Sequence, residues 1–194
     1  MLRFVNPSDL SLSEVKGVWF LTAKRSVIIS RGSGVWDAVV ASVPEKYRAA
    51  MADPMASEWY PEELVAVMLE RLESIVAEGD PARLAKFIEE GTVDGISRFF
   101  RSVLGLATPA FVLRRLPALW RLVRRGAGTV SVDADSTGAT VSYSGNAFWE
   151  DARYRVLTTC TLRALLRMCT GQEPSVREGA FTRDTFVVHI QYVT

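Results

Sequence analysis

The sequence contains few of the residues from which most catalytic and metal sites are built. Its 194 residues include one histidine, His189, and two cysteines, Cys160 and Cys169. A single histidine excludes multi-histidine metal centres. As a general base, His189 would need an orienting partner that the sequence does not identify. We therefore expect no metal site and no histidine-based catalytic site.

The two cysteines are too few and badly placed for a disulfide. They lie nine residues apart in one predicted helix, which puts them on opposite faces and roughly 13 Å apart along its axis. Two thiols in that arrangement cannot bridge each other. The expected state is a pair of reduced thiols in a cytoplasmic protein.

Long apolar runs and an excess of one charge are also missing. No stretch approaches the roughly 18 apolar residues of a membrane helix. Asn6, Pro7 and Asp9 interrupt the start before a signal peptide could form. Twenty-three basic and twenty-two acidic residues leave a net charge of +1, which argues against nucleic acid as a partner. We expect a cytoplasmic protein without a membrane span.

Two motifs imitate ligand loops without completing them. The segment 32–34, Gly-Ser-Gly, has aspartate at position 37 where a dinucleotide fingerprint needs glycine, and no Gly-Lys-Ser/Thr occurs anywhere. The segment 133–138 begins like a calcium loop, but its twelfth position is Ser144 instead of glutamate. A hairpin turn explains the second segment better. The glutamate pairs at 62–63 and 89–90 are interpreted as exposed helix ends, so we predict no catalytic residue and no cofactor.

Helical periodicity dominates the chain up to residue 125. Ser11 or Ser13 can cap a helix from about residue 14 to 29, and proline followed by acids at 61–63 starts the clearest core helix, which ends at Gly79. Further helices are predicted at about 35–42, 45–51, 81–91, 93–104 and 108–125, the last kinked by Pro117.

From residue 129 the apolar period changes to two. Val130, Val132, Val141 and Tyr143 alternate with polar residues, and a turn separates the two runs, which predicts a β-hairpin. A helix over about 151–169 and a second hairpin over about 175–192 follow. The predicted class is α+β: a helix-rich part (about 11–125) packed on a small antiparallel sheet (about 128–194) in one domain of residues 1–194.

Arginines concentrate between residues 98 and 125, where there are seven and no acid. On a helical projection of 111–125, Arg114, Arg121, Arg124 and Arg125 fall within about 100° of one another, opposite the apolar residues. One interpretation is a solvated face paired with acids of neighbouring helices. The other is a basic face that binds an acidic protein surface.

Aromatic residues are dense in the helical part. Most are expected in the core, but some are candidates for lining an apolar pocket between helices and sheet. The candidate lining residues are Trp19, Trp59, Phe99, Phe111 and Trp120.

Several short motifs occur in a fixed order: Val-Lys-Gly at 15–17, Val-Pro-Glu-Lys-Tyr-Arg at 43–48, Ser-Glu-Trp-Tyr-Pro at 57–61, Gly-Asp-Pro at 79–81 and Pro-Ala-Phe-Val-Leu-Arg-Arg-Leu-Pro-Ala-Leu-Trp at 109–120. This set resembles a bacterial paralogue family of unknown function and about this length. The order of elements is similar to the superfamily of heme–nitric oxide binding domains, four-vinyl-reductase-like domains and Bet3-type subunits of the TRAPP complex. The resemblance implies ligand sensing, dimerisation and protein contact.

Two departures limit what the resemblance carries over. Heme-binding members have a proximal histidine on a helix and a Tyr-x-Ser-x-Arg motif, whereas His189 lies on a predicted strand and Tyr154-Arg155 lacks the spacing. Bet3-type subunits can hold an acyl chain on a cysteine, but neither Cys160 nor Cys169 lies in a matching motif. Neither heme nor acylation is therefore expected.

Two functional hypotheses follow. The first is a non-enzymatic regulatory or scaffold module that binds a protein partner, with the basic face available to an acidic surface and a homodimer as one possible form. The alternative is a sensor domain that binds a small hydrophobic ligand or acyl chain in an apolar pocket.

Overall fold

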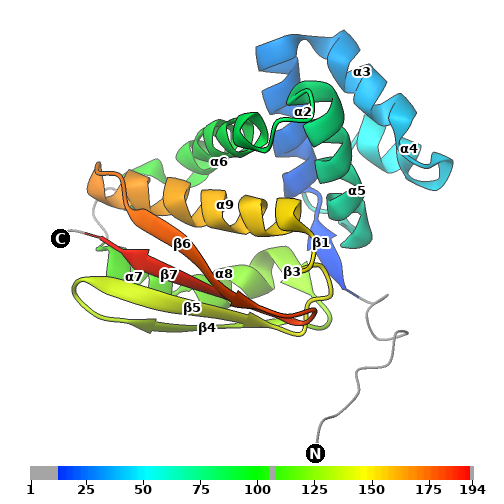
Figure 1. Ribbon diagram of the computed structural model, residues 1–194. Helices are drawn as coiled ribbons and strands as arrows, with labels where there is room; N and C mark the ends of the chain where they lie inside the picture. Colours follow the sequence, from blue (N-terminus) through cyan, green and yellow to red (C-terminus); the bar gives the residue numbers. More distant parts are fainter. Residues whose placement is uncertain (1–12, 105–107, 193–194) are drawn as a thin grey trace, which may run out of the picture.

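The computed structural model describes residues 13–104 and 108–192, and the side chains of 13–95 and 108–192 (Figure 1). Its helical elements are α2 (Val18–Arg31), α3 (Ser33–Ser42), α4 (Glu45–Ala52), α5 (Glu63–Arg71), the π-helical segment η1 (Leu72–Val76), α6 (Pro81–Leu104), α7 (Pro109–Arg114), α8 (Leu116–Val123) and α9 (Ala152–Thr170). Its strands are β1 (Glu14–Lys16), β2 (Trp59–Pro61), β3 (Arg124–Arg125), β4 (Thr129–Ala134), β5 (Gly138–Ser144), β6 (Ser175–Phe181) and β7 (Thr185–Gln191). The predicted α+β class is confirmed.

The larger sheet contains the two predicted hairpins, paired in the order β4-β5-β7-β6 with every neighbour antiparallel. In the register of β5 and β7, Val141 lies opposite Val188 and Tyr143 opposite Phe186. These four side chains are buried. Alternation along the strands therefore gives the sheet one apolar face, as the period of two predicts.

Helices cover that apolar face. α8 packs beside β4 and α9 beside β6, while α6 runs along α9. Figure 1 shows α9 lying across the sheet, with α2 to α5 gathered at one end of α6 and α9. A single cluster of buried side chains joins the helical part to the sheet. Within the described residues, no helix is long and apolar enough to cross a membrane.

The first predicted helix begins later than its sequence pattern suggests. Residues 14–16 form β1 instead, which pairs with β2 on one side and with β3 on the other. Val15 is fully buried between them. The expectation of helix from residue 14 was wrong because pairing with segments distant in sequence outweighs local helix propensity.

The predicted end of a helix at Gly91 was also wrong, because α6 continues through Gly91 and Gly95 to Leu104. Both glycines face α2 closely: a Cβ at Gly91 would lie 2.7 Å from Ser26 Oγ, and one at Gly95 would lie 3.1 Å from Thr22 Cγ2. These glycines allow two helices to approach each other and do not terminate one.

Pro117 separates two helices where we predicted one kinked helix. α7 ends at Arg114, and Pro117 occupies the first turn of α8, where its missing N–H costs no hydrogen bond. We predicted that the helix would continue to residue 125, but α8 ends at Val123. Arg124 and Arg125 instead form β3 and pair with β1. This short strand decides the geometry of the candidate site.

Candidate functional site

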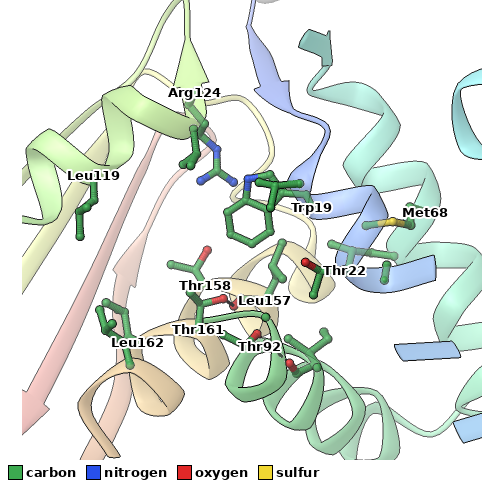
Figure 2. A pocket seen from close by; sticks show the side chains of 18 of the residues that line it. Trp19, Thr22, Met68, Thr92, Leu119, Arg124, Leu157, Thr158, Thr161 and Leu162 are labelled. Carbon is green, nitrogen blue, oxygen red and sulfur yellow. Dashed lines mark hydrogen bonds between the residues drawn. The ribbon is translucent and has the colours of Figure 1, made fainter. Parts of the chain in front are cut away.

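A pocket of about 400 Å³ lies between α2, α5, α6, α8 and α9. Figure 2 shows the side chains that point into it. Most are apolar, and they include Trp19, Ala23, Met68, Leu69, Leu72, Phe87, Ile88, Leu116, Leu119, Trp120, Val123, Leu157, Leu162 and Leu165. A cavity of this size and lining suits a small ligand.

One wall of the pocket is α8, which also packs beside β4. α8 buries none of its residues, although five of them line the pocket: Leu116, Leu119, Trp120, Leu122 and Val123. Leu122 is 66% exposed. An apolar helix face that meets a cavity lacks the close packing of a protein core, so a ligand in the pocket would complete the contacts of α8.

The hydroxyl groups in the pocket add little polarity. Thr158 Oγ1 donates to Tyr154 O at 3.0 Å, Thr161 Oγ1 to Leu157 O at 2.7 Å, and Thr92 Oγ1 to Ile88 O at 2.7 Å. Each of these hydroxyl hydrogens is thus used within its own helix. The part of the pocket that they line remains mainly apolar.

A buried ionic cluster closes one end of the pocket. Glu62 Oε1 accepts hydrogen bonds from Arg124 Nε at 2.9 Å, from Asn146 Nδ2 at 3.0 Å and from the Tyr154 hydroxyl. Arg124 Nη2 also donates to the Tyr154 hydroxyl at 3.0 Å. The side chains of Arg124 and Glu62 are only 7% and 3% exposed. Four segments that are distant in sequence therefore meet in one hydrogen-bond network.

Aromatic rings hold the guanidinium of Arg124 at the pocket wall. Its central carbon lies 3.9 Å from the ring centroid of Trp120 and 5.1 Å from that of Trp19, within the range of cation–π attraction. Figure 2 shows the guanidinium beside the indole of Trp19. The Trp19 indole nitrogen is buried and has no hydrogen-bond partner among the described residues.

The ionisation of this cluster follows from its burial and its partners. Burial opposes the charge of Arg124, but Tyr154 and Glu62 outweigh it and raise the pKa of the guanidinium. Burial also raises the pKa of Tyr154, and Glu62 adds to this effect while Arg124 opposes it. Arg124 therefore stays charged, and Tyr154 stays protonated and donates to Glu62.

The four arginines of the expected basic face do not share one surface. Arg114 and Arg121 are exposed on α7 and α8, and Arg125 is exposed in β3, where it pairs with Glu14. Arg124 is buried and belongs to the pocket. Including Arg124 in a solvent face was wrong, because successive residues of a strand point to opposite sides.

The structure separates the five aromatic candidates for pocket lining. Trp19 and Trp120 line the pocket. Trp59 lies in β2 against Lys16 and Arg125, and Phe111 is 52% exposed on α7, so neither contributes to the pocket. Phe99 lies outside the residues whose side chains the structure describes.

The remaining candidates lie away from the pocket. His189 is exposed on the outer face of β7, 3.4 Å from Thr140 Oγ1. Asp135 Oδ1 accepts from the backbone N–H groups of Thr137 at 2.7 Å and Gly138 at 2.9 Å, the hydrogen bonds of a hairpin turn. Cys160 and Cys169 are both free thiols on α9. No group of three potential metal ligands occurs within the part of the chain that the structure describes.

Sequence reasoning missed Glu62, Asn146 and Tyr154. Glu62 follows Pro61 at the start of a helix, a position typical of an exposed acid. Asn146 lies in the loop after β5 and carries no local signal. The one available clue is the tyrosine-arginine pair at 154–155, whose spacing does not match the heme motif.

Solved structures with a similar fold share one description: they are H-NOX proteins or domains. No family model matches the chain, and no curated protein matches its sequence. Among solved structures, an unliganded Fe(II) H-NOX protein from K. algicida has a TM-score of 0.66 at 10% identity over 91% of this chain and 95% of its own. An H-NOX protein from S. oneidensis in the Fe(II)NO state has 0.63 at 11% identity over 91% and 98%. An oxygen-binding H-NOX domain related to soluble guanylate cyclases has 0.61 at 14% identity over 91% and 94%. The chain thus has the fold of H-NOX domains.

The residues of the pocket do not fit heme. Histidine and cysteine, the commonest protein ligands of heme iron along with methionine and tyrosine, are absent from the pocket lining: His189 lies on the outer sheet face, and neither cysteine lines the pocket. Tyr143 and Met68 remain. Burial raises the pKa of Tyr143, which disfavours the phenolate that iron requires, and Met68 alone offers a weak thioether. The chain therefore has the H-NOX fold, but its pocket lacks residues suited to bind heme iron.

Proposed function

We propose that this protein is a non-enzymatic sensor domain whose pocket binds a small hydrophobic ligand. The observation that carries this proposal is the apolar pocket of about 400 Å³ that α8 covers without burying any of its own residues. A hydrophobic ligand that fills it would be stabilised by burial of its apolar surface and by dispersion contacts with the lining side chains.

The fold supports the same conclusion. Solved H-NOX structures of this fold are described as oxygen-binding and as NO-ligated. By analogy, we propose that this chain also uses the space between its helical part and its sheet for a ligand. Glu62 and the Tyr154 hydroxyl are already paired with each other and with Arg124, which favours binding over catalysis.

The proposal can be tested by blocking the pocket. Thr161 lines the pocket and Thr170 does not, yet both lie on α9 and donate to the carbonyl four residues earlier. We expect Thr161→Phe to abolish binding of decane and related ten-carbon molecules, and Thr170→Phe to preserve it. Binding is measured by native mass spectrometry and by the fluorescence of Trp19 and Trp120.

The outcome separates a real pocket from nonspecific adsorption. Binding that Thr161→Phe weakens by about tenfold or more while Thr170→Phe leaves it unchanged supports the sensor function. Equal binding by both variants, or no binding of any ten-carbon molecule by the unmodified protein, contradicts it. Circular dichroism of each variant verifies that it has folded.

A second candidate function is contact with a protein partner through α7 and α8. Phe111 and Leu122 are 52% and 66% exposed, and Arg115 stacks on Phe111. Arg114 and Arg121 are exposed beside them. We propose that an acidic partner, or a second copy in a homodimer, covers this surface. Replacing Arg114 and Arg121 with Glu should then remove whatever association pull-down and light scattering detect.

A further inference from the structure

The polar end of the pocket holds two hydrogen-bond donors that have no partner among the described residues. Arg124 uses Nε for Glu62 and Nη2 for Tyr154, and no hydrogen bond among the described residues involves Nη1. The indole N–H of Trp19, beside the same guanidinium (Figure 2), is also unpaired. The Trp19 indole nitrogen is buried, and a buried donor without a partner is costly, so a ligand group that accepts hydrogen bonds is favoured at this end.

The charge of the site is already balanced. Glu62 is buried with Arg124, and its carboxylate accepts three hydrogen bonds. A carboxylate or phosphate on the ligand would place a second buried anion near Glu62 and would lose its own hydration. A neutral acceptor would meet neither penalty.

We propose that the ligand is a neutral, mainly hydrocarbon molecule that carries a carbonyl group at one end, bound by Arg124 and Trp19. This inference rests on the proposed sensor function and defines its ligand class. A cavity of about 400 Å³ holds roughly a dozen groups the size of a water molecule, at about 30 Å³ each. A ketone, ester or amide with a medium-length chain fits that volume, and its chain would contact α8.

The experiment compares three ten-carbon probes that differ only in the head group: decane, the methyl ketone and decanoic acid at pH 8. We expect the ketone to bind about tenfold more tightly than decane, as one hydrogen bond to a charged donor implies. Decanoate should bind no better than decane. Tighter binding of decanoate than of the ketone would overturn the inference and indicate an anion site.

Two variants test the donors. Trp19→Phe removes the indole N–H and should reduce the preference for ketone over decane to less than about threefold. Trp36→Phe is the matched control, because the Trp36 indole nitrogen is equally buried and unpaired but Trp36 does not line the pocket. The preference should survive in the control.

A further variant removes the ion pair as a unit. Glu62→Gln combined with Arg124→Met keeps the cluster neutral and avoids an unpaired buried charge. In this double variant decane should still bind, while the advantage of the ketone disappears. If no probe binds the unmodified protein, the sensor function itself fails. If all three probes bind equally, the sensor function stands and only the assignment of a carbonyl ligand is wrong.

Discussion

Arg124 and Arg125 are neighbours in one short strand, and the structure gives them opposite environments. Arg124 is buried against two indole rings and hydrogen-bonded to Glu62 and Tyr154. Arg125 lies in solvent and contacts Glu14 and Trp59. Both form an ion pair with a glutamate that is distant in sequence, but only Arg124 of the two lines the pocket. The comparison shows that the contribution of an ion pair to stability depends more on whether the pair is buried than on which residue is the partner.

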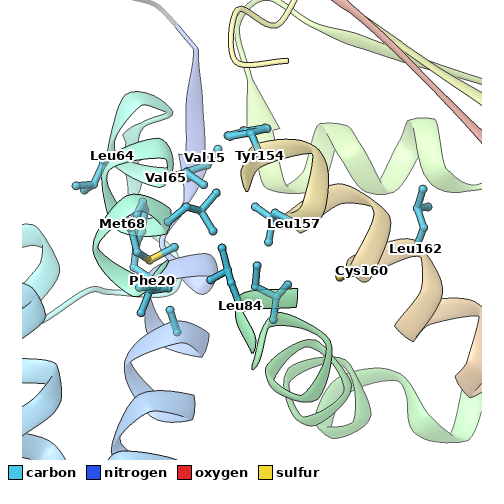
Figure 3. Close-up of a cluster of buried hydrophobic side chains, with 14 of the residues drawn as sticks. Val15, Phe20, Leu64, Val65, Met68, Leu84, Tyr154, Leu157, Cys160 and Leu162 are labelled. Carbon is cyan, nitrogen blue, oxygen red and sulfur yellow. The ribbon is translucent and has the colours of Figure 1, made fainter. Parts of the chain in front are cut away.

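Figure 3 shows buried apolar side chains around Tyr154. Val15, Val65 and Tyr154 lie where β1, α5 and α9 meet, and all three are buried. Tyr154 thus belongs to the apolar core through its ring and to the ionic cluster through its hydroxyl. Among the helices near the exposed arginines, α7 buries Pro109, Val112 and Leu113, whereas α8 buries no residue.

The largest expected effect comes from breaking the buried ion pair. Glu62→Ala leaves Arg124 charged in a buried site and removes the acceptor of Asn146 and Tyr154, which should lower the free energy of unfolding by about 3 to 5 kcal/mol. Urea denaturation at pH 7 measures it. Glu14→Ala, which removes the partner of exposed Arg125, should cause no measurable change. Equal effects of the two substitutions would remove the distinction between the two arginines.

Removing the hydroxyl of Tyr154 should lower the free energy of unfolding by a smaller amount. Tyr154→Phe keeps the ring but deletes the group that links Glu62 to Arg124, at a cost of about 1 to 3 kcal/mol. The matched control is Tyr47→Phe, because the Tyr47 hydroxyl donates to the next glutamate, Glu63, whose side chain is 57% exposed. A loss in the control as large as in Tyr154→Phe would contradict the special role of the buried cluster.

Because Cys160 on α9 is buried, the free energy of unfolding should also depend on pH. Burial raises the pKa of the Cys160 thiol to about 11, above its ordinary value, so the native state keeps a proton that the unfolded state releases. The resulting stability is present below the unfolded pKa and is lost as the pH rises toward 11, by about 1 kcal/mol between pH 8 and pH 10. Comparing urea denaturation of the unmodified protein and Cys160→Ala at both pH values measures it. The prediction fails if both proteins lose the same stability.

The smallest effect on stability is expected from a substitution on the exposed side of α8. Arg121 is exposed, and Arg121→Glu should change the free energy of unfolding by less than about 0.5 kcal/mol. Thermal denaturation provides the measurement. A large loss would show that the surface of α8 contributes to folding and is not free for a partner.

Local patterns were sufficient for much of this fold. Both hairpins, the helix between them and the helices that start at Pro81 and Pro109 were predicted, because alternation, helical periodicity and proline at helix starts are properties of neighbouring residues. The helix expected from Pro61 begins two residues later, at Glu63, because Pro61 belongs to strand β2. The polar outer position of His189 followed from the same alternation. Two of the five aromatic candidates, Trp19 and Trp120, lie in the wall of the pocket.

The candidate site was predicted only in part, for a physical reason. Glu62, Arg124, Asn146 and Tyr154 are up to 92 residues apart in the chain, and no local rule relates them. Strand β1 and the continuation of α6 through Gly91 were missed for the same reason, since each depends on a partner segment elsewhere in the sequence. A helical projection likewise placed Arg124 in solvent because it assumed that the helix continued.

The amino acids and their order were enough to specify an α+β chain with one histidine, no disulfide and nearly balanced charge, since these properties need no knowledge of distant contacts. Folding in three dimensions decided which arginine is buried, which glycines let helices approach and where a cavity remains. The reason is that pairing, burial and the loss of hydration act between residues far apart in sequence, and these terms outweigh local preference wherever the two disagree.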